Sequence, residues 1–350
     1  MIFAALISLL KTYEGGKRIV NKKKSVNYAK FGYIFSIPFV VAYLIFQLYP
    51  VLYTVVIGFT DLEGLTTPVS SMHILSNPFQ NFIDILKGSG AGSFRLCLFN
   101  TVVMWVCNFI PQIALALLLT AWFTDDRSKI KGQGLFKVLF YLPNIITAAS
   151  VAILFQAFLS YPIGPLNSIR ASILNTFSSN FDGKGYNFLN NKAFTRGVVS
   201  FIQFWMWYGN TMVLLIAGVI GIDPAIFEAA QIDGASRTQT FFKITIPCIR
   251  TILLYVLVTS MIGGLNMFDI PHLLNRGGPD GATTTTAVYI YKQAFQNPRY
   301  QYNKAAAASI IMFVIIMILT LCLFYILRDK DEEELKKLRK KERKALKHQA

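Results

Sequence analysis

The sequence predicts an all-α integral membrane protein with six membrane-spanning helices. Of its 350 residues, 54% are hydrophobic and 15% are charged, whereas soluble domains have about 25% charged residues. The mean hydropathy is +0.47. The apolar residues also gather in blocks without any Asp, Glu, Lys, Arg or His, and these blocks are residues 31–59, 97–123, 138–160, 197–221, 251–268 and 305–327.

Each block is expected to cross the membrane as one helix. Most approach or exceed the roughly 20 residues that a helix needs to cross the bilayer core. The fifth block is shorter, but Cys248 and Ile249 extend it past Arg250, whose long side chain can reach the membrane interface. Several blocks contain a proline, such as Pro143 in the third. Spanning helices tolerate proline where neighbouring helices bind the freed carbonyl groups.

The positive charges indicate the orientation of the chain. The net charge is +16, and 24 of the 34 Lys and Arg residues lie in segments 1–30, 124–137, 222–250 and 328–350. These segments share one side of the membrane, so the positive-inside rule predicts that both termini are cytoplasmic. A nucleic-acid-binding protein would instead gather its charge on one folded face beside base-stacking aromatic residues. We therefore expect contact with membrane lipids and none with nucleic acid.

Three regions follow along the chain. Residues 1–30 are expected to form a cytoplasmic or interfacial segment, because the apolar run at its start is too short to span the membrane. Its positive charges follow the apolar run, whereas in a signal peptide they precede it. Residues 31–327 form the six-span domain. Residues 328–350 form a basic cytoplasmic tail, predicted to be a solvated helix that contacts acidic lipid head groups, with Glu332/Lys336 and Glu333/Lys337 at the favourable spacing of four residues.

The two larger outer loops differ in pattern. In the loop 60–96, Phe82, Ile85 and Leu86 recur at helical spacing, which predicts a helix lying on the membrane surface. The loop 161–196 is rich in Asn, Ser and Gly and is predicted to be irregular.

Residues 222–247, here called the inner loop, are predicted to form a helix–glycine–helix unit on the cytoplasmic side. Asp223 is a good N-cap residue, and Pro224 suits the first helical position because its missing N–H would have no partner there. Gly234 can adopt the left-handed backbone that ends a helix. A second short helix is expected from Ala235 to about Lys243, before Pro247 opens the fifth span.

The inner loop also resembles a known family. Its residues Glu228-Ala229-Ala230, then Gly234, then Ile244-Thr245-Ile246-Pro247 are similar to the EAA motif of binding-protein-dependent ABC importer permeases, except that the family usually has Leu in place of Ile246. The resemblance implies that the first helix of the loop is a coupling helix seated in a cleft of a separate ATPase subunit. The coupling residues that it implies are Glu228 as an ATPase contact, Ala229 and Ala230 for close approach, Gly234 for the turn, and Asp233 and Arg237.

Other segments resemble the sugar-transporting branch of that family. They are residues 136–143, 275–279 and 283–295, together with Tyr49-Pro50 followed by residues 58–61. The resemblance covers residues 31–327. It implies the six-helix core of a type I ABC importer permease of the maltose or multiple-sugar branch, in the bacterial plasma membrane. The implied partners are a second, homologous permease, two ATPase subunits and an extracellular solute-binding lipoprotein or periplasmic protein. ATP and Mg²⁺ would bind to the ATPase, because this chain lacks the GxxxxGK[ST] loop and is expected to bind no cofactor.

The charge-free spans restrict the solute. They contain no acidic side chain and no histidine, with Asp269 at the outer end of the fifth span, which argues against a proton- or sodium-coupled carrier. An anionic solute would need a buried counter-charge, so a neutral sugar is expected. By resemblance to maltose-type permeases, the candidate substrate-binding residues are Asn144, Ala148, Trp207, Asn210, Ser260, Gly264, Asn266 and Met267. Alternatively, the three Asn side chains only hydrogen-bond neighbouring helices.

Other functions remain open from the sequence. An ABC permease could carry another solute, such as a polyamine, phosphate, glycerol phosphate or molybdate, and an ATP-independent channel or carrier would work without an ATPase. A membrane enzyme is disfavoured, because no nucleophile/base pair or metal cluster is evident near a membrane face. We therefore expect a transport subunit that is not itself an enzyme.

Overall fold

The computed structural model describes residues 29–327, with the exception of 91, 126, 129 and 178–183. In this part of the chain the secondary structure is helical, and a single isolated bridge pairs Thr60 with Ile74. The all-α prediction is therefore confirmed. The predicted N-terminal segment up to residue 28 and the basic tail from residue 328, with its Glu332/Lys336 and Glu333/Lys337 pairs, lie outside the described residues.

The chain divides into two compact units, residues 1–53 and 54–350. The described part of the first unit is one apolar helix, formed by α2 (Ala29–Tyr43), the π-helical turn η1 (Leu44–Leu48) and the start of α3 (Tyr49–Ile57). The π turn precedes Pro50, which has no N–H with which to continue the α-helical hydrogen bonds. Apolar side chains, such as Tyr33 and Phe35, lie all round this helix, which is the pattern of a membrane-spanning or buried helix.

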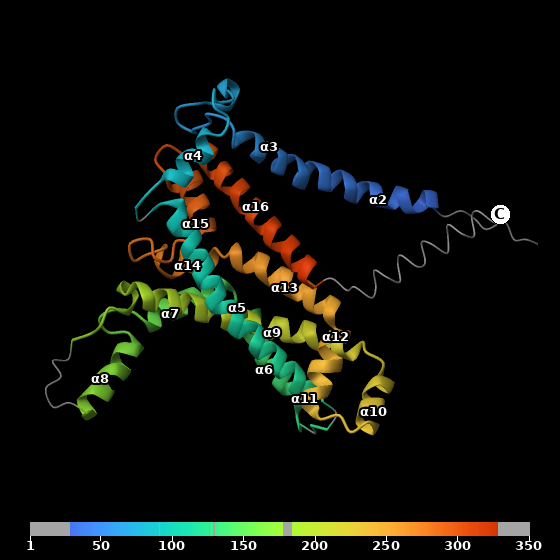
Figure 1. Ribbon diagram of the computed structural model, residues 1–350. Helices are drawn as coiled ribbons and strands as arrows, with labels where there is room; N and C mark the ends of the chain where they lie inside the picture. Colours follow the sequence, from blue (N-terminus) through green and yellow to red (C-terminus); the bar gives the residue numbers. More distant parts are fainter. Residues whose placement is uncertain (1–28, 91, 126, 129, 178–183, 328–350) are drawn as a thin grey trace, which may run out of the picture. The chain divides into compact units, whose positions relative to one another are not determined.

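The second unit holds the remaining elements (Figure 1). Its outer-loop elements are η2 (Val69–Ser71), α4 (Gln80–Lys87), α8 (Pro165–Phe177), η3 (Phe188–Asn190), α15 (Thr286–Tyr291) and η5 (Lys292–Gln296). Its long or paired helices are α5 (Phe94–Thr124), α6 (Gln133–Ile145), α7 (Ala148–Phe158), α9 (Lys192–Ile220), α13 (Arg250–Leu265), α14 (Asp269–Asn275) and α16 (Tyr302–Ile326). The inner loop contains α10 (Pro224–Ile232), α11 (Arg237–Thr240), η4 (Phe241–Thr245) and α12 (Ile246–Cys248).

Five helical regions of the described chain are long and apolar enough to cross a membrane: Lys30–Ile57, Phe94–Thr124, Lys192–Ile220, Arg250–Asn275 and Tyr302–Ile326. The third predicted span, residues 138–160, is a pair of helices, α6 and α7, bent by 86° at a short break, and makes a sixth span only if the pair is counted as one broken span. The prediction of one continuous helix over 138–160 is therefore wrong. Pro143 cannot donate a backbone hydrogen bond, and Thr147 caps a new helix by accepting a hydrogen bond from the Ser150 N–H at 3.2 Å.

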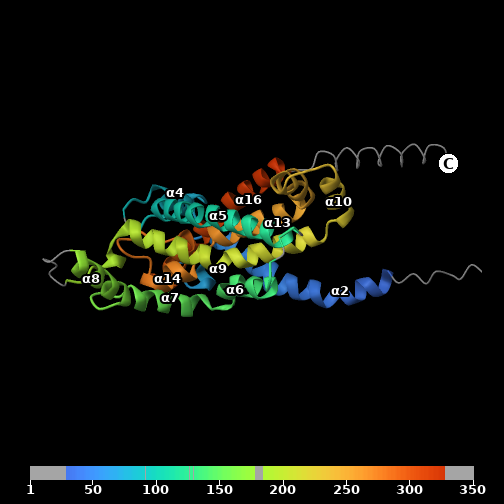
Figure 2. The same ribbon diagram turned by 90° about the horizontal axis from the view of Figure 1, so that it is seen from below.

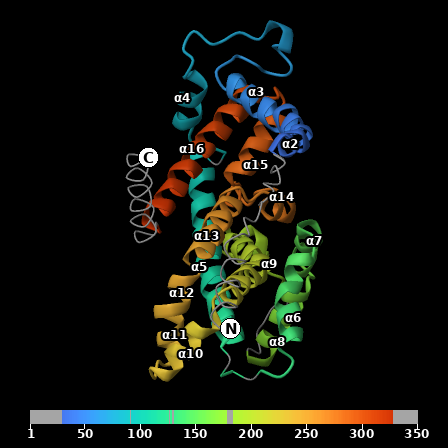
Figure 3. The same cartoon turned by 90° about the vertical axis from the view of Figure 1, so that its right-hand side faces the viewer.

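Helix α5 is central to the second unit. It packs along α9 and also contacts α4, α13 and α15, and Figure 2 shows α9 running beside it. The three apolar clusters of the unit each contain α5 side chains: Leu119 in the first, Cys97 in the second and Met104 in the third. In Figure 3 the inner-loop helices α10, α11 and α12 lie together at one end of α5, while α4 lies at the other end. Helix α5 thus connects the outer and the inner side of the unit.

At its outer end, α5 holds the loop after α14 through a buried polar network. The Asn100 Nδ2 donates hydrogen bonds to the carbonyl oxygens of Gly281 at 2.8 Å and Thr284 at 3.1 Å. The Arg196 guanidinium of α9 donates to Asn100 Oδ1 at 2.6 Å and to the Ala282 carbonyl at 2.9 Å. One amide and one guanidinium thus bind this glycine-rich loop to two long helices.

The outer helix predicted over residues 77–86 exists as α4, but it packs against protein. Its Ile85 is buried, and Phe82 packs against the cluster around α16. The Asn81 amide donates hydrogen bonds to the carbonyl oxygens of Gly58 at 3.0 Å and Thr60 at 2.8 Å. These contacts with α5, α16 and the preceding loop position α4, whereas Leu86 alone of the three predicted apolar residues is exposed.

The prediction of an irregular loop over residues 161–196 is wrong in part, because α8 spans Pro165–Phe177. Its residues Ile169, Ile173 and Phe177 recur every four positions, a helical spacing that the Asn- and Ser-rich composition obscures. The buried Asn167 amide donates hydrogen bonds to the carbonyl oxygens of Ser160 at 3.0 Å and Tyr186 at 3.1 Å. This bonding holds the start of α8 to the rest of its loop.

Replacing Asn100 with alanine tests the outer network. We expect Asn100→Ala to reduce stability by about 2 kcal/mol or more, because two carbonyl groups and a guanidinium lose a buried partner. The measurement is the apparent melting temperature of the detergent-purified protein. Ser309→Ala is the matched control, since its hydroxyl bonds only to Ala305 of its own helix and its loss should leave the melting temperature nearly unchanged. Equal effects of the two changes would contradict the role given to Asn100.

Candidate functional site

A cavity of about 270 Å³ lies among the middle portions of the long helices. This feature is here called the membrane cavity. Helices α5, α9 and α13 form most of its wall, with contributions from α7 and α14. The lining residues are Asn108, Gln112, Ala148, Gln203, Met206, Trp207, Asn210, Thr211, Thr259, Ser260, Gly263, Gly264, Asn266, Met267, Phe268, Asp269 and Ile270.

A polar contact between three helices closes the inner end of this cavity. The Gln112 Nε2 of α5 donates a hydrogen bond to Thr211 Oγ1 of α9 at 2.8 Å and lies 3.4 Å from Ser260 Oγ of α13. Toward the inner loop the same helices form an apolar cluster that includes Leu215 and Val256. Between Gln112 and the inner loop, therefore, the bundle is packed with apolar side chains.

The membrane cavity gathers seven of the eight residues that the sequence singled out: Ala148, Trp207, Asn210, Ser260, Gly264, Asn266 and Met267. Asn144 is not among the lining residues. Its Nδ2 donates a hydrogen bond to the Met206 carbonyl of α9 at 3.2 Å, which is the helix-to-helix contact considered as the alternative for the three Asn side chains. The Asn266 amide bonds to Ile262 of its own helix at 2.9 Å.

Sequence reasoning missed several polar lining residues, among them Asn108, Gln112, Gln203 and Thr211. Each is an amide or hydroxyl within an otherwise apolar span. This polarity is the one feature of the sequence that could have indicated a place in the cavity wall. The lining contains one carboxylate, Asp269, and no Lys or Arg. Such a surface of amides, hydroxyls and aromatic rings can hydrogen-bond hydroxyl groups and cover apolar C–H faces.

The inner loop folds as its residues predict. The Asp223 carboxylate caps α10 by accepting a hydrogen bond from the Ala225 N–H at 3.0 Å, and Pro224 is the first helical residue. Gly234 has a φ of +74°, the left-handed conformation in which glycine ends a helix. The second helix is shorter than expected: α11 begins at Arg237 after the cap Ser236 and continues as the π turn η4 into α12.

Helix α10 presents apolar and acidic side chains away from the protein. Glu228 and Ala229 are exposed, and Ile226 and Ile232 are 41% and 86% exposed. On its other face, Ala230 is buried and Phe227 packs against the apolar cluster at the inner end of α5. The helix is thus fixed on one side and carries unpaired apolar surface on the other.

The side chain of Arg237 turns back into the protein, toward the turn that follows α5. Its Nε lies 3.1 Å from Asp125 Oδ2, and its two Nη atoms donate hydrogen bonds to Ser128 Oγ at 3.3 Å and to the Arg127 carbonyl at 3.1 Å. Burial alone would raise the pKa of Asp125, but hydrogen bonds from Arg127 and the charges of Arg127 and Arg237 together lower this pKa below its usual value. The carboxylate therefore stays ionised at neutral pH.

Comparison with known proteins gives the family of this chain. The model of the family described as "binding-protein-dependent transport system inner membrane component" matches residues 85–330. The chain belongs to this family. It is a multi-pass inner membrane component of a transport system, which agrees with the resemblance seen in residues 228–247. Its described residues carry the family's helical fold.

Several relatives of this inner membrane component are named for sugars. It is 28% identical to the lactose transport system permease protein of Rhizobium radiobacter, over 77% of this chain and 86% of the relative. It is 26% identical to the multiple sugar-binding transport system permease protein of Streptococcus mutans, over 79% and 88% of the two chains. The arabinooligosaccharides transport system permease protein of Bacillus subtilis is 25% identical, over 78% and 81%.

A solved structure shares the fold of this inner membrane component. A bacterial ABC transporter involved in the import of the acidic polysaccharide alginate matches with a TM-score of 0.67 and 24% identity, over 85% of this chain and 95% of that chain. The same kind of transporter in complex with a periplasmic protein that binds an alginate pentasaccharide matches with a TM-score of 0.65. The fold is therefore that of an ABC importer permease.

Thiol labelling tests which of the Asn residues face the membrane cavity. In a chain without its native cysteines, we expect Asn210→Cys and Asn266→Cys to react with a small water-soluble thiol reagent. Asn144→Cys should react at least about tenfold more slowly, because a thiol at a helix contact is reached only through local opening. The measurement is the labelling rate in membrane vesicles. A reaction at position 144 as fast as at 210 would refute the placement of Asn144 between α6 and α9.

Proposed function

We propose that this chain is a membrane-spanning subunit of an ATP-driven, binding-protein-dependent importer of neutral oligosaccharides. Its membrane cavity is half of the solute pathway, and a second, homologous permease supplies the other half. ATP and Mg²⁺ bind to two separate ATPase subunits, and this chain carries out no covalent chemistry. The observation that carries the proposal is the pairing of a polar cavity whose lining holds no Lys or Arg with an exposed helix at the inner end of the same bundle.

Helix α10 is the part that engages the ATPase. An exposed surface formed by Ile226, Ala229 and Ile232 beside the carboxylate of Glu228 is suited to a partner with an apolar cleft and a positive charge. The short helices on both sides of Gly234 make this surface a firm projection rather than a flexible connection. ATP-driven closure of the ATPase subunits moves α10 and thereby the spans.

The solute is assigned from the cavity lining and the names of the relatives. Lactose, arabinooligosaccharides and multiple sugars appear in those names, and hydroxyl-rich solutes suit the amides and the Trp207 ring of the cavity. The alginate transporter carries an acidic sugar, but an anion in the present cavity would meet Asp269 without a cationic partner among the lining residues. A neutral sugar is therefore favoured.

The orientation follows from the distribution of Lys and Arg. With both termini in the cytoplasm of a bacterium, the inner loop faces the ATPase, and the loops 60–96, 161–196 and 271–304 face the extracellular solute-binding protein. Solute passes from that protein into the membrane cavity when the bundle opens outward.

Uptake by cells that express or lack this chain tests the proposed solute class. We expect expressing cells to take up at least one of lactose, maltotriose and arabinotriose, and to lose this uptake when the gene is deleted. Spermidine and glycerol 3-phosphate serve as cationic and anionic comparisons and should be unaffected. Loss of spermidine or glycerol 3-phosphate uptake alone would refute the sugar assignment and favour the corresponding solute.

Two substitutions in α10 and its turn test the ATPase contact. Glu228→Lys reverses an exposed charge, and Gly234→Arg costs about 1–2 kcal/mol because a side chain is strained at a φ of +74°. We expect both variants to abolish uptake at normal abundance in the membrane. Glu228→Gln and Gly234→Asn are the matched controls and should retain uptake in part, since the first keeps the size of the side chain and Asn tolerates the left-handed backbone. Normal uptake in both primary variants would contradict the role of α10.

A further inference from the structure

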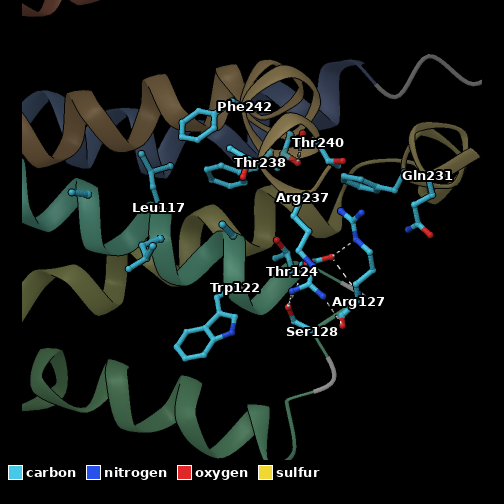
Figure 4. Close-up of a pocket in the computed structure, with 17 residues that line it drawn as sticks. Leu117, Trp122, Thr124, Arg127, Ser128, Gln231, Arg237, Thr238, Thr240 and Phe242 are labelled. Carbon is cyan, nitrogen blue, oxygen red and sulfur yellow. Dashed lines mark hydrogen bonds and ion pairs between the residues drawn. The ribbon is translucent and has the colours of Figure 1, made fainter. Parts of the chain in front are cut away.

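A cluster of side chains joins the inner loop to the end of α5. It consists of Asp125, Arg127, Ser128 and Arg237 with the carbonyl group of Ala235, and is here called the clamp. Figure 4 shows Arg237 directed toward Arg127 and Ser128, with dashed lines between them. These groups lie 108 to 112 residues apart in the sequence where they cross between the two loops. The proposed coupling role of the inner loop does not by itself explain them.

The two arginines of the clamp form hydrogen bonds in both directions between the inner loop and the turn after α5. Arg237 reaches from the inner loop to three groups of the turn after α5: the Asp125 carboxylate at 3.1 Å, the Ser128 hydroxyl at 3.3 Å and the Arg127 carbonyl at 3.1 Å. Arg127 reaches back and donates a hydrogen bond to the Ala235 carbonyl at 3.3 Å. The planar guanidinium fork fixes the direction of such bonds more strictly than an apolar contact does.

Both ends of the clamp are held firmly. Arg237 is the first residue of α11, where Ser236 and Gln239 form a reciprocal capping box. Asp125 directly follows α5, its side chain is 18% exposed, and it accepts hydrogen bonds from the N–H and the Nε of Arg127. The Arg237 side chain, which is 59% exposed, thus spans the gap between two anchors that are held by local hydrogen bonds.

The clamp lies in the wall of a second cavity between these elements. About 720 Å³ of open space lies between the inner half of α5 and the inner loop, lined by residues such as Leu117, Trp122 and Phe242. Along this side α5 and the inner loop do not pack closely. Phe227 provides an apolar contact to the core, and the clamp provides the directional one.

The helices of the membrane cavity complete the argument. The inner loop is joined through the chain itself to α9 on one side and to α13 on the other. Helix α5, the third main wall of the cavity, packs against α9 and α13 but is not joined to the inner loop through the chain. Asp125 lies 13 residues after Gln112, which marks the inner end of the cavity. The stretch of α5 between them is about 20 Å long at 1.5 Å per residue.

We infer that the clamp is the link through which movement of the inner loop reaches α5, so that Asp125 and Arg237 are positioning residues for coupling. This inference rests on the proposed function. It places Arg237 in a contact within its own chain, where the resemblance implied a role in coupling to the ATPase. With the clamp intact, all three walls of the membrane cavity follow the inner loop. Without it, α9 and α13 follow the inner loop directly, and α5 follows only through its packing against them.

The experiment compares ATP-dependent changes on two walls of the cavity. The full importer is purified through a tagged chain without native cysteines and placed in lipid, and one cysteine reports on each wall: Asn108→Cys on α5 and Thr259→Cys on α13. Both native side chains line the cavity and donate hydrogen bonds only within their own helices. Labelling by a membrane-impermeant maleimide is measured with and without ATP and vanadate.

In Asp125→Asn and in Arg237→Gln, we expect the ATP-dependent change at position 108 to fall about fivefold or more, the lower end of usual coupling between sites. The change at position 259 should persist. The double variant should fall no further than either single variant, because both remove the same link. Lys243→Gln, which removes the same charge from the inner loop outside the clamp, is the matched control and should behave as the unmodified chain.

Each outcome decides between the two proposals. If position 108 responds normally in both variants, or if both reporters fall together, the clamp is not a specific link to α5. If neither reporter responds to ATP and vanadate in the unmodified complex, the proposed function fails. Arg237→Lys keeps the charge but cannot make all three contacts, so its response at position 108 should be intermediate. If Arg237→Gln is not present in the membrane at normal abundance, Arg237→Lys replaces it. A normal response of Arg237→Lys at position 108 then counts against the clamp.

Discussion

The structure depends on the cost of leaving a polar group without a partner inside an apolar bundle. Without water, an amide, hydroxyl or carbonyl group must find its hydrogen bond within the protein or face a wet cavity. Asn100 meets this requirement by binding the outer glycine-rich loop, and Gln112 by joining α5 to α9 and α13. The same requirement explains why several other amides and hydroxyls of the spans, such as Asn108 and Asn210, gather around the membrane cavity. The few polar residues of the spans therefore mark both the joints and the solute path.

Helix α5 connects these sites. Its outer end binds the loop after α14, its middle forms a wall of the membrane cavity, and its inner end carries Asp125 of the clamp. A single helix without a break in its described length keeps these three points at constant separation. Under the proposed function, such a helix lets a movement of the inner loop change the cavity and the loop after α14 together. Pro111 lies within α5 without dividing it.

The sequence was least informative where neighbours override local pattern. Residues 138–160 are apolar throughout, so nothing in their hydropathy indicates the 86° bend between α6 and α7. Pro143 and Thr147 were visible, but whether a spanning helix breaks at a proline depends on the helices that surround it. Asn144, on the same stretch, faces α9 instead of the cavity for this reason. The clamp was beyond sequence reasoning, because nothing local indicates that Arg237 meets Asp125.

The sequence by itself determined the apolar spans, the capped helix at Asp223 and Pro224, and the turn at Gly234, because hydropathy, helix caps and left-handed glycine depend on residues close together in the chain. It also marked seven residues that line the membrane cavity. Only the tertiary structure decided which amides meet across helices, which helix is broken, and how the inner loop is bound to α5. The contacts among them join residues 62 to 184 positions apart, and the local pattern of amino acids does not indicate such pairings.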